Sequence, residues 1–363
     1  QSDLIQLSLT CSQFRNKLNS TIFRKIELLK DGEIIPGKPN KSSKKKQLDI
    51  LIDILEEDYL DKYHFVKHCI SWEFCNNSFN TQFFNMFKYI TKLELYSGST
   101  NITNFASDTG NSSRLINILK YLKNLEILRL GCKLINFTET ENISDFKLPI
   151  CLKVLNVMGF SSDRLSFSPI ENINEEYAKL KNATIINNSM LASMVVLMSS
   201  LTEVTFFNNQ YFSADLLCQF FSLNPQLKKI SISLKFVQSN HLNIGCDITQ
   251  NILIPILSTL TSLQTLEFSE YDFWNFSSID WSSYDKKIPL FYLNGIWNAN
   301  SNVDEFVNPE IFDKIKFSNM FELEYYFMYY GFDELDNWKV VQDDLADSRE
   351  FWLVKKGEDE VNK

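Results

Sequence analysis

The sequence predicts an α/β fold in which short parallel strands form a curved sheet with helices along its outer side. Three observations lead to this prediction: an apolar pattern recurs along the chain, its last residues alternate with polar ones, and helical spacing separates the copies. Apolar–polar alternation indicates a strand with one buried face, and strands that alternate with helices form parallel sheets. One such unit cannot bury its apolar face alone, so we expect the units to stack into a solenoid.

The recurring pattern is an apolar residue, two others, an apolar residue, one other, and an apolar residue. Its clearest copy lies at Leu125, Leu128 and Leu130. The middle residues of successive copies from 93 to 266 lie 21 to 36 residues apart. Leucine-rich repeats run about 20 to 29 residues, so the spacing predicts an irregular leucine-rich-repeat solenoid. The other copies are Ile90-Leu93-Leu95, Leu152-Leu155-Val157, Leu180-Ala183-Ile185 (weak), Leu201-Val204-Phe206, Leu227-Ile230-Ile232, Leu263-Leu266-Phe268 and Leu323-Tyr326-Met328, with one more expected near 290–293.

Helical spacing of apolar residues separates several copies. It occurs in 115–122, in 216–221 and in 252–260, where Pro255 is expected to interrupt the helix. The alternative is a doubly wound α/β domain, whose strands are usually apolar on both faces. Here the residue between the last two apolar positions is polar, which favours a solenoid whose concave strand face is open to solvent. These residues are Glu94, Arg129, Asn156, Thr205, Ser231 and Glu267.

Composition excludes several functional classes. Lys and Arg total 36 against 45 Asp and Glu, a net charge of −9, which argues against binding of nucleic acid or anionic membranes by the whole chain. No apolar run approaches the roughly 18 residues of a membrane helix. The seven cysteines are scattered and form no CxxC pair, so we expect reduced thiols and a cytoplasmic or nuclear location.

The sequence contains no recognisable catalytic constellation. It lacks the phosphate-binding and dinucleotide-binding glycine motifs and the G-x-S-x-G motif. His64 and His68 are four residues apart beside Cys69, but the segment leads into an expected strand and no fourth ligand has zinc spacing. We therefore expect no enzyme activity, no cofactor and no metal site.

The first 29 residues combine an apolar helical face with a strand-like ending, Ile26-x-Leu28. This stretch resembles the C-terminal half of an F-box, and with the repeats that follow, the chain resembles an F-box/leucine-rich-repeat protein of fungal type. The Leu-Pro element and first helix of the F-box do not precede Gln1, and the chain does not begin with Met, so we expect a fragment of a longer protein. The residues that match are Asp3, Leu4, Leu7, Leu9, Cys11, Phe14, Arg15, Ile22, Phe23, Arg24, Ile26 and Leu28.

The resemblance implies a substrate-recognition subunit of a cullin–RING (SCF-type) ubiquitin ligase. The F-box would dock the adaptor, which joins the cullin scaffold, and the repeats would bind a protein substrate. The alternative is a leucine-rich-repeat protein-binding scaffold without a ligase role. The adaptor-binding residues are expected among Leu4, Leu7, Leu9, Cys11 and Phe14. The substrate-binding residues are expected to be Arg129, Asn156, Thr205, Ser231 and Glu267, together with the aromatic residues Tyr325, Phe327 and Tyr329 on the concave face near the C-terminus.

Four regions follow from these patterns. Residues 1–29 form the C-terminal part of the F-box, and 30–62 a basic loop and an amphipathic helix that is expected over 47–63. Residues 63–330 form the repeats, the first strand lying within 66–72 in a register that the pattern does not fix. Residues 331–363 form an acidic cap and tail, with ten acidic and five basic residues and two expected strands at 338–341 and 351–354.

Overall fold

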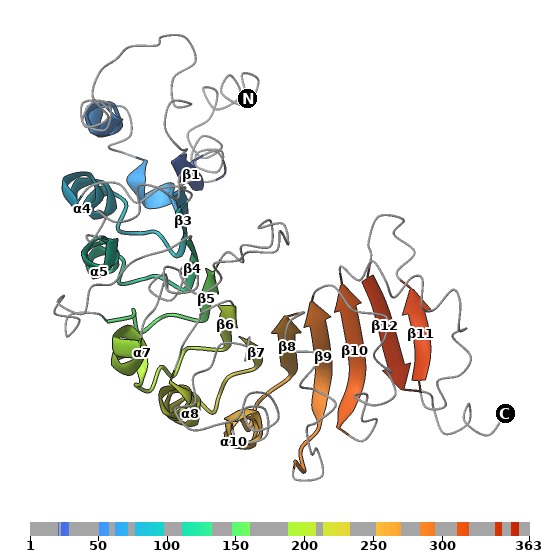
Figure 1. Ribbon diagram of the computed structural model, residues 1–363. Coiled ribbons are helices and arrows are strands. Elements are labelled where there is room, and N and C mark those ends of the chain that lie inside the picture. Colours follow the sequence, from blue (N-terminus) through green and yellow to red (C-terminus); the bar gives the residue numbers. More distant parts are fainter. Residues whose placement is uncertain are drawn as a thin grey trace, which may run out of the picture. The chain divides into compact units, whose positions relative to one another are not determined.

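The computed structural model describes residues 21, 23–28, 51–57, 62–71, 77–97, 111–132, 147–159, 188–207, 213–232, 252–269, 284–294, 311–318, 338–342 and 350–355. The chain divides into two compact units, residues 1–194 and 195–363. Both are mixed α/β structures (Figure 1). Within the described residues, no helix has the length and apolarity needed to cross a bilayer.

The strands of the first unit are parallel and follow one another in chain order. They are β1 (Lys25–Leu28), β2 (His68–Ser71), β3 (Lys92–Ser97), β4 (Ile127–Cys132) and β5 (Val154–Gly159). Its described helical elements include residues 51–57, η1 (Tyr63–Phe65), α4 (Asn77–Met86), α5 (Asn111–Tyr121) and α7 (Asn188–Met194). Helices α4 and α5 lie side by side along one face of the strands (Figure 1).

The second unit repeats this arrangement and ends in a hairpin. The parallel strands are β6 (Glu203–Phe207), β7 (Lys229–Ile232), β8 (Thr265–Ser269), β9 (Ile288–Asn294) and β10 (Phe312–Ser318). Strand β12 (Glu350–Lys355) pairs antiparallel with β10, and β11 (Trp338–Gln342) pairs antiparallel with β12. The described helices are α8 (Ala214–Leu223) and α10 (Ile254–Thr259). The strands expected at 338–341 and 351–354 are thus present as β11 and β12.

Strand order separates the two architectures that the sequence left open. A doubly wound sheet reverses its strand order at a switch point. Within each unit the parallel strands instead add one after another in chain order, as stacked repeats do. The described strands therefore have the topology of a leucine-rich-repeat-like solenoid.

One backbone arrangement recurs where the strands begin. The residue just before each of these strands offers its carbonyl oxygen to the following strand in the chain. That oxygen accepts two N–H groups, one from the first residue of the following strand and one from the residue just before that strand. Thr91 and Lys92 donate to the Lys67 oxygen at 2.9 Å, and Lys228 and Lys229 donate to the Thr202 oxygen at 2.8 and 3.1 Å. The same pairing occurs at the oxygens of Arg24, Thr91, Glu126 and Lys228. Equivalent backbone contacts at equivalent positions identify these segments as structural repeats in both units.

The apolar positions of the pattern form the core. Leu93, Leu128 and Leu155 are fully buried and pair in register across β3, β4 and β5. The aromatic rings of Phe83 in α4 and of Phe87 just after it are also fully buried, with their centroids 4.7 Å apart. Burying one such side chain stabilises the fold by about 1.5–3 kcal/mol, so packing, rather than intrinsic strand propensity, holds these short strands in place.

The structure corrects several details of the expected elements. Helix α10 begins at Ile254, so Pro255 lies in its first turn, where proline is tolerated, and does not interrupt it. Strand β10 has the repeat pattern at Phe312, Ile315 and Phe317 but is not among the expected copies, whereas β9 is the copy expected near 290–293. Of the helix expected over 47–63, residues 51–57 are helical and Tyr63 begins η1.

In the first repeat, Cys69 and Ser71 pair with the core residues Leu93 and Leu95, which fixes the register of β2. The weak copy at 180–185, the late copy at 323–328 and the basic loop expected within 30–62 fall outside the described residues.

Candidate functional site

The polar residues between the apolar strand positions form in-register rows. In the first unit Glu94, Arg129 and Asn156 are direct neighbours on β3, β4 and β5. In the second unit Thr205, Ser231 and Glu267 are neighbours on β6, β7 and β8. Because side chains alternate along a strand and the flanking apolar residues enter the core, both rows lie on the sheet face opposite the core.

The exposed fractions of several row side chains differ from the solvent-open face that the sequence suggests. The Arg129 side chain is 41% exposed, and Asn156 and Thr205 are partly exposed. Ser231 is only 1% exposed and Glu267 6%, so the expectation that these positions are open to solvent is wrong for them. Glu94, at 6%, is also buried. Neighbouring side chains on the same face cover these groups, and whether the rows contact a substrate stays a prediction.

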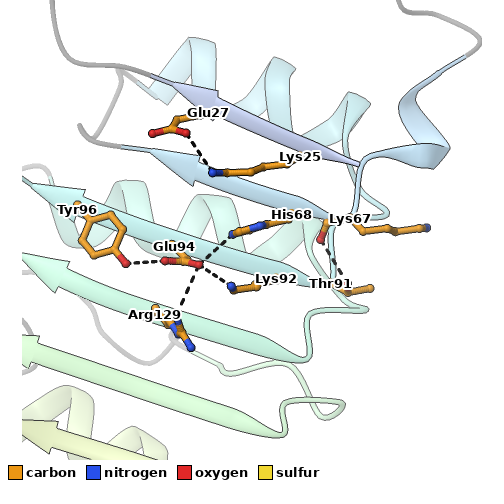
Figure 2. Close-up of polar contacts among 9 residues, drawn as sticks. All are labelled: Lys25, Glu27, Lys67, His68, Thr91, Lys92, Glu94, Tyr96 and Arg129. Carbon is orange, nitrogen blue, oxygen red and sulfur yellow. Dashed lines mark hydrogen bonds and ion pairs between the residues drawn. The ribbon is translucent and has the colours of Figure 1, made fainter. Parts of the chain in front are cut away.

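Glu94 is the centre of a polar cluster in the first unit (Figure 2). Its Oε1 lies 2.7 Å from Lys92 Nζ and 3.8 Å from Arg129 Nη1, and it accepts a 2.9 Å hydrogen bond from His68 Nε2. Its Oε2 accepts a 2.5 Å hydrogen bond from the Tyr96 hydroxyl. The register of β2, β3 and β4 places His68 beside Lys92 and Glu94 beside Arg129, so the cluster follows from the pairing of strands far apart in sequence.

The cluster sets the charge of its members. Burial would raise the pKa of Glu94, but the contacts with Lys92, Tyr96 and His68 lower it to about 2. Burial and the hydrogen bond to Glu94 raise the pKa of Tyr96 to about 12. Burial and the nearby Lys92 charge lower the pKa of His68, against the opposing effect of Glu94. At neutral pH, therefore, the cluster holds one carboxylate beside the basic side chains of Lys92 and Arg129.

Gly131 leaves space for the Tyr96 ring. The two residues are direct neighbours on β4 and β3. A Cβ atom at Gly131 would lie 2.6 Å from Tyr96 Cδ1, closer than such atoms approach. The absence of a side chain at 131 thus allows the ring to lie over β4 with its hydroxyl on Glu94.

A second buried carboxylate occupies the row of the second unit. Glu267 Oε2 accepts a 2.7 Å hydrogen bond from the Ser231 hydroxyl and lies 3.0 Å from Lys229 Nζ. The row then continues through Tyr292 on β9 and Lys316 on β10 to Trp352 on β12. These three residues lie outside the expected site but occupy its continuation.

His64 and His68, four residues apart in sequence, lie in different elements of the first repeat. Within the described residues, no group of three or more His, Cys, Asp or Glu side chains is placed to hold a metal ion. His64 lies in η1 and His68 in β2, where it contacts Glu94, so the two do not share one helix face.

Several expected site residues lie outside the described residues. The adaptor-facing set Leu4, Leu7, Leu9, Cys11 and Phe14 is one group, and the aromatic residues Tyr325, Phe327 and Tyr329 are the other.

Sequence reasoning did not identify His68, Lys92 and Tyr96 as partners of Glu94. One available signal was spacing along the strand: Lys92 and Tyr96 flank Glu94 at two residues on either side and therefore share its face. No comparable signal places His68, because its position depends on the pairing of β2 with β3.

No protein-family model matches the chain, and no curated protein matches it in sequence. Among solved structures it is similar to the chain in "Crystal structure of TLR13-ssRNA13 complex", with a TM-score of 0.35 and 13% identity, covering 77% of this chain and 34% of that one. The chain thus spans about a third of that protein's length. The assignment of stacked repeats rests on this chain's own strand order, register and recurring backbone contacts.

Proposed function

We propose that this chain is a leucine-rich-repeat scaffold that binds a protein on the exposed face of its sheet. The observation that carries the proposal is the pair of in-register rows, in which successive repeats each present one side chain. They include Arg129, Tyr292 and Trp352, and Arg, Tyr and Trp are the residue types most enriched at binding hot spots.

The rows favour binding because contacts within the chain already order their side chains before a partner binds. Tyr96, Lys92 and His68 contact Glu94, and Ser231 and Lys229 contact Glu267. Ordering side chains on association costs affinity, so a face ordered by its own contacts loses less on binding. The exposed members, Arg129 above all, are then the ones available to a partner.

We further propose that the chain is the substrate-recognition subunit of an SCF-type ubiquitin ligase. The support is the F-box resemblance of residues 1–29 and its position directly before the repeats. The adaptor and the cullin would be partners, and the repeats would hold the substrate near a ubiquitin-charged enzyme. The chain would contribute proximity rather than chemistry. Among the described residues, Cys151 and Cys218 are free thiols, which suits the cytoplasm or nucleus.

The test is capture from the native cell with the full-length gene product, probed for the F-box adaptor and the cullin. Leu7→Asp should abolish adaptor capture, because it places a charge on the proposed docking helix. The matched control is Leu197→Asp, since Leu197 is 67% exposed and lies far from residue 7 in the sequence. Failure of the folded wild-type protein to capture adaptor would contradict the ligase role and leave the protein-binding scaffold.

A further inference from the structure

Strands β4 and β5 present two pairs of neighbouring side chains on the face opposite the core. Arg129 and Asn156 are direct neighbours, and so are Ile127 and Val154, which lie two residues earlier on the same strands. Side chains two residues apart on a strand share a face, so the four lie together on one side of the sheet. All four residues are partly exposed. Two adjacent repeats of the first unit thus combine an apolar pair with a polar pair.

The polar pair contains two unused hydrogen-bonding atoms. Among the described side chains, Arg129 Nε and Asn156 Oδ1 are buried polar atoms that have no hydrogen-bond partner. Such atoms are rare in folded proteins, because an unpaired buried group has lost its bonds to water without a replacement. The arginine Nε is a donor and the asparagine Oδ1 an acceptor. Neighbouring strands therefore offer one donor and one acceptor side by side.

The chemistry of this pair selects a neutral amide over a carboxylate. The charge of Arg129 is already partly compensated, because Glu94 Oε1 lies 3.8 Å from its Nη1 (Figure 2). A carboxylate bound at Arg129 Nε would place an oxygen without a proton near Asn156 Oδ1, where two acceptors repel each other. A primary carboxamide instead carries an acceptor and a donor on one planar group, and Asn and Gln use it to bind a donor–acceptor pair with two hydrogen bonds.

We propose that Arg129 and Asn156 bind an Asn or Gln side chain of a partner protein. The carboxamide oxygen of that side chain accepts from Arg129 Nε, and its N–H group donates to Asn156 Oδ1. Its methylene groups pack on Ile127 and Val154. Because Arg129 and Asn156 are partly exposed, rotation about their side-chain bonds brings both atoms to the ligand.

This inference rests on the proposed protein-binding function and names the side chain that this part of the face selects. The edge of a nucleobase also combines a donor with an acceptor. A nucleic acid fits less well, because the net charge of −9 repels an extended polyanion.

The test selects binders from a bead-displayed library of random 12-residue peptides, with the full chain and, in parallel, with Arg129→Lys/Asn156→Leu. We expect peptides captured by the wild-type chain to be enriched in Asn and Gln, and the double variant to lose this enrichment. Lys keeps the charge without the planar guanidinium, and Leu keeps the approximate shape of Asn without its acceptor. The control Asn85→Leu/Arg114→Lys makes the same exchanges on α4 and α5 and should keep the enrichment.

The best peptide, synthesised with a fluorophore, separates the two hydrogen bonds from charge and from packing. Replacing its Asn or Gln by the matching acid, or by Leu or Met of similar shape, should weaken binding to the wild-type chain at least about tenfold. The Asn156→Leu chain should bind the amide and acid peptides within about threefold of each other, since the acceptor that distinguishes them is gone. The peptide substitutions leave the chain unchanged, so they test the inference even if a variant fails to fold.

Capture of no peptide, capture without Asn or Gln enrichment, or enrichment that persists in the double variant would overturn the inference. So would loss of enrichment in the control variant, or tighter binding of the acid peptide than of the amide peptide. Tighter binding of a 12-nucleotide oligouridylate than of any peptide would overturn it as well. Photo-crosslinking at Thr205, which leaves the pair intact, and adaptor capture by the wild-type protein test the proposed function separately.

Discussion

Replacing Glu94 by Gln tests whether the buried cluster stabilises the first unit. The substitution keeps the side chain's shape and removes its charge, so it resembles the protonated carboxyl group. Lys92 and Arg129 then lose their shared counter-charge, and the Tyr96 hydroxyl and His68 lose a charged acceptor. The amide still accepts a hydrogen bond at one atom, so the loss is mainly electrostatic.

The pKa of Glu94 gives the magnitude. It lies at about 2, against an ordinary value of 4.5. A difference of about 2.5 pH units corresponds to about 3 kcal/mol in favour of the charged form in the folded state. For a unit of this size, that loss lowers Tm by about 6–12 °C. The folded-state pKa is depressed, so the stabilisation is present above about pH 4.5 and disappears as pH falls towards 2.

The assay is urea denaturation of wild type and variant between pH 2 and 7, with hydrogen exchange of β2 to β4 to assign the loss to this region. The matched control is Glu126→Gln, because Glu126 pairs with Lys153 at 3.0 Å but both side chains are about half exposed. Exposed pairs contribute less than about 1 kcal/mol. Equal costs for the two variants at pH 7, or a Glu94→Gln cost that persists at pH 2, would refute the reasoning.

Three further predictions concern single contacts. Gly131→Ala should cost about 1–3 kcal/mol in urea denaturation, because its Cβ displaces the Tyr96 ring, and the cost should vanish in a Tyr96→Ala background. Asn224→Ala should lower the free energy of unfolding by about 3 kcal/mol, because the side-chain amide is fully buried and hydrogen-bonded. The amide accepts from the Met198 N–H at 2.9 Å and donates to the Val196 and Phe220 oxygens at 3.1 and 2.8 Å. A cost below about 1 kcal/mol would contradict this prediction. In a 295 nm titration, Tyr96 should ionise near pH 12, and Glu94→Gln should return it towards 10; an unchanged midpoint would count against the hydrogen bond.

The repeat strands are predictable from sequence because burial imposes the pattern directly. Leu93, Leu128 and Leu155 must enter one core, so their spacing alone marks the strands. The polar residue between two such positions lies on the opposite face for the same reason. Strand β10 shows the limit of counting copies: Phe312, Ile315 and Phe317 carry the pattern, but they lie between the copies expected near 290–293 and at 323–328 and match neither.

The contacts within the rows depend on register, which the sequence leaves open. Glu94 is buried because His68 comes from β2 and Arg129 from β4, more than 20 residues away on either side. The close approach of Tyr96 to Gly131 likewise depends on the pairing of β3 with β4. A pattern of apolar residues fixes which face a side chain occupies, but not which neighbours cover it.

The central claim, that the sheet face opposite the core binds a protein, is tested most directly by photo-crosslinking in the native cell. A benzophenone amino acid would replace Asn156 or Thr205 on the face, and Lys120 or Gln219 on exposed helix surfaces of the same units. We expect the face positions to give a discrete protein adduct and the helix positions to give none. Adducts from the helix positions alone, or from no position in a folded protein, would contradict the account.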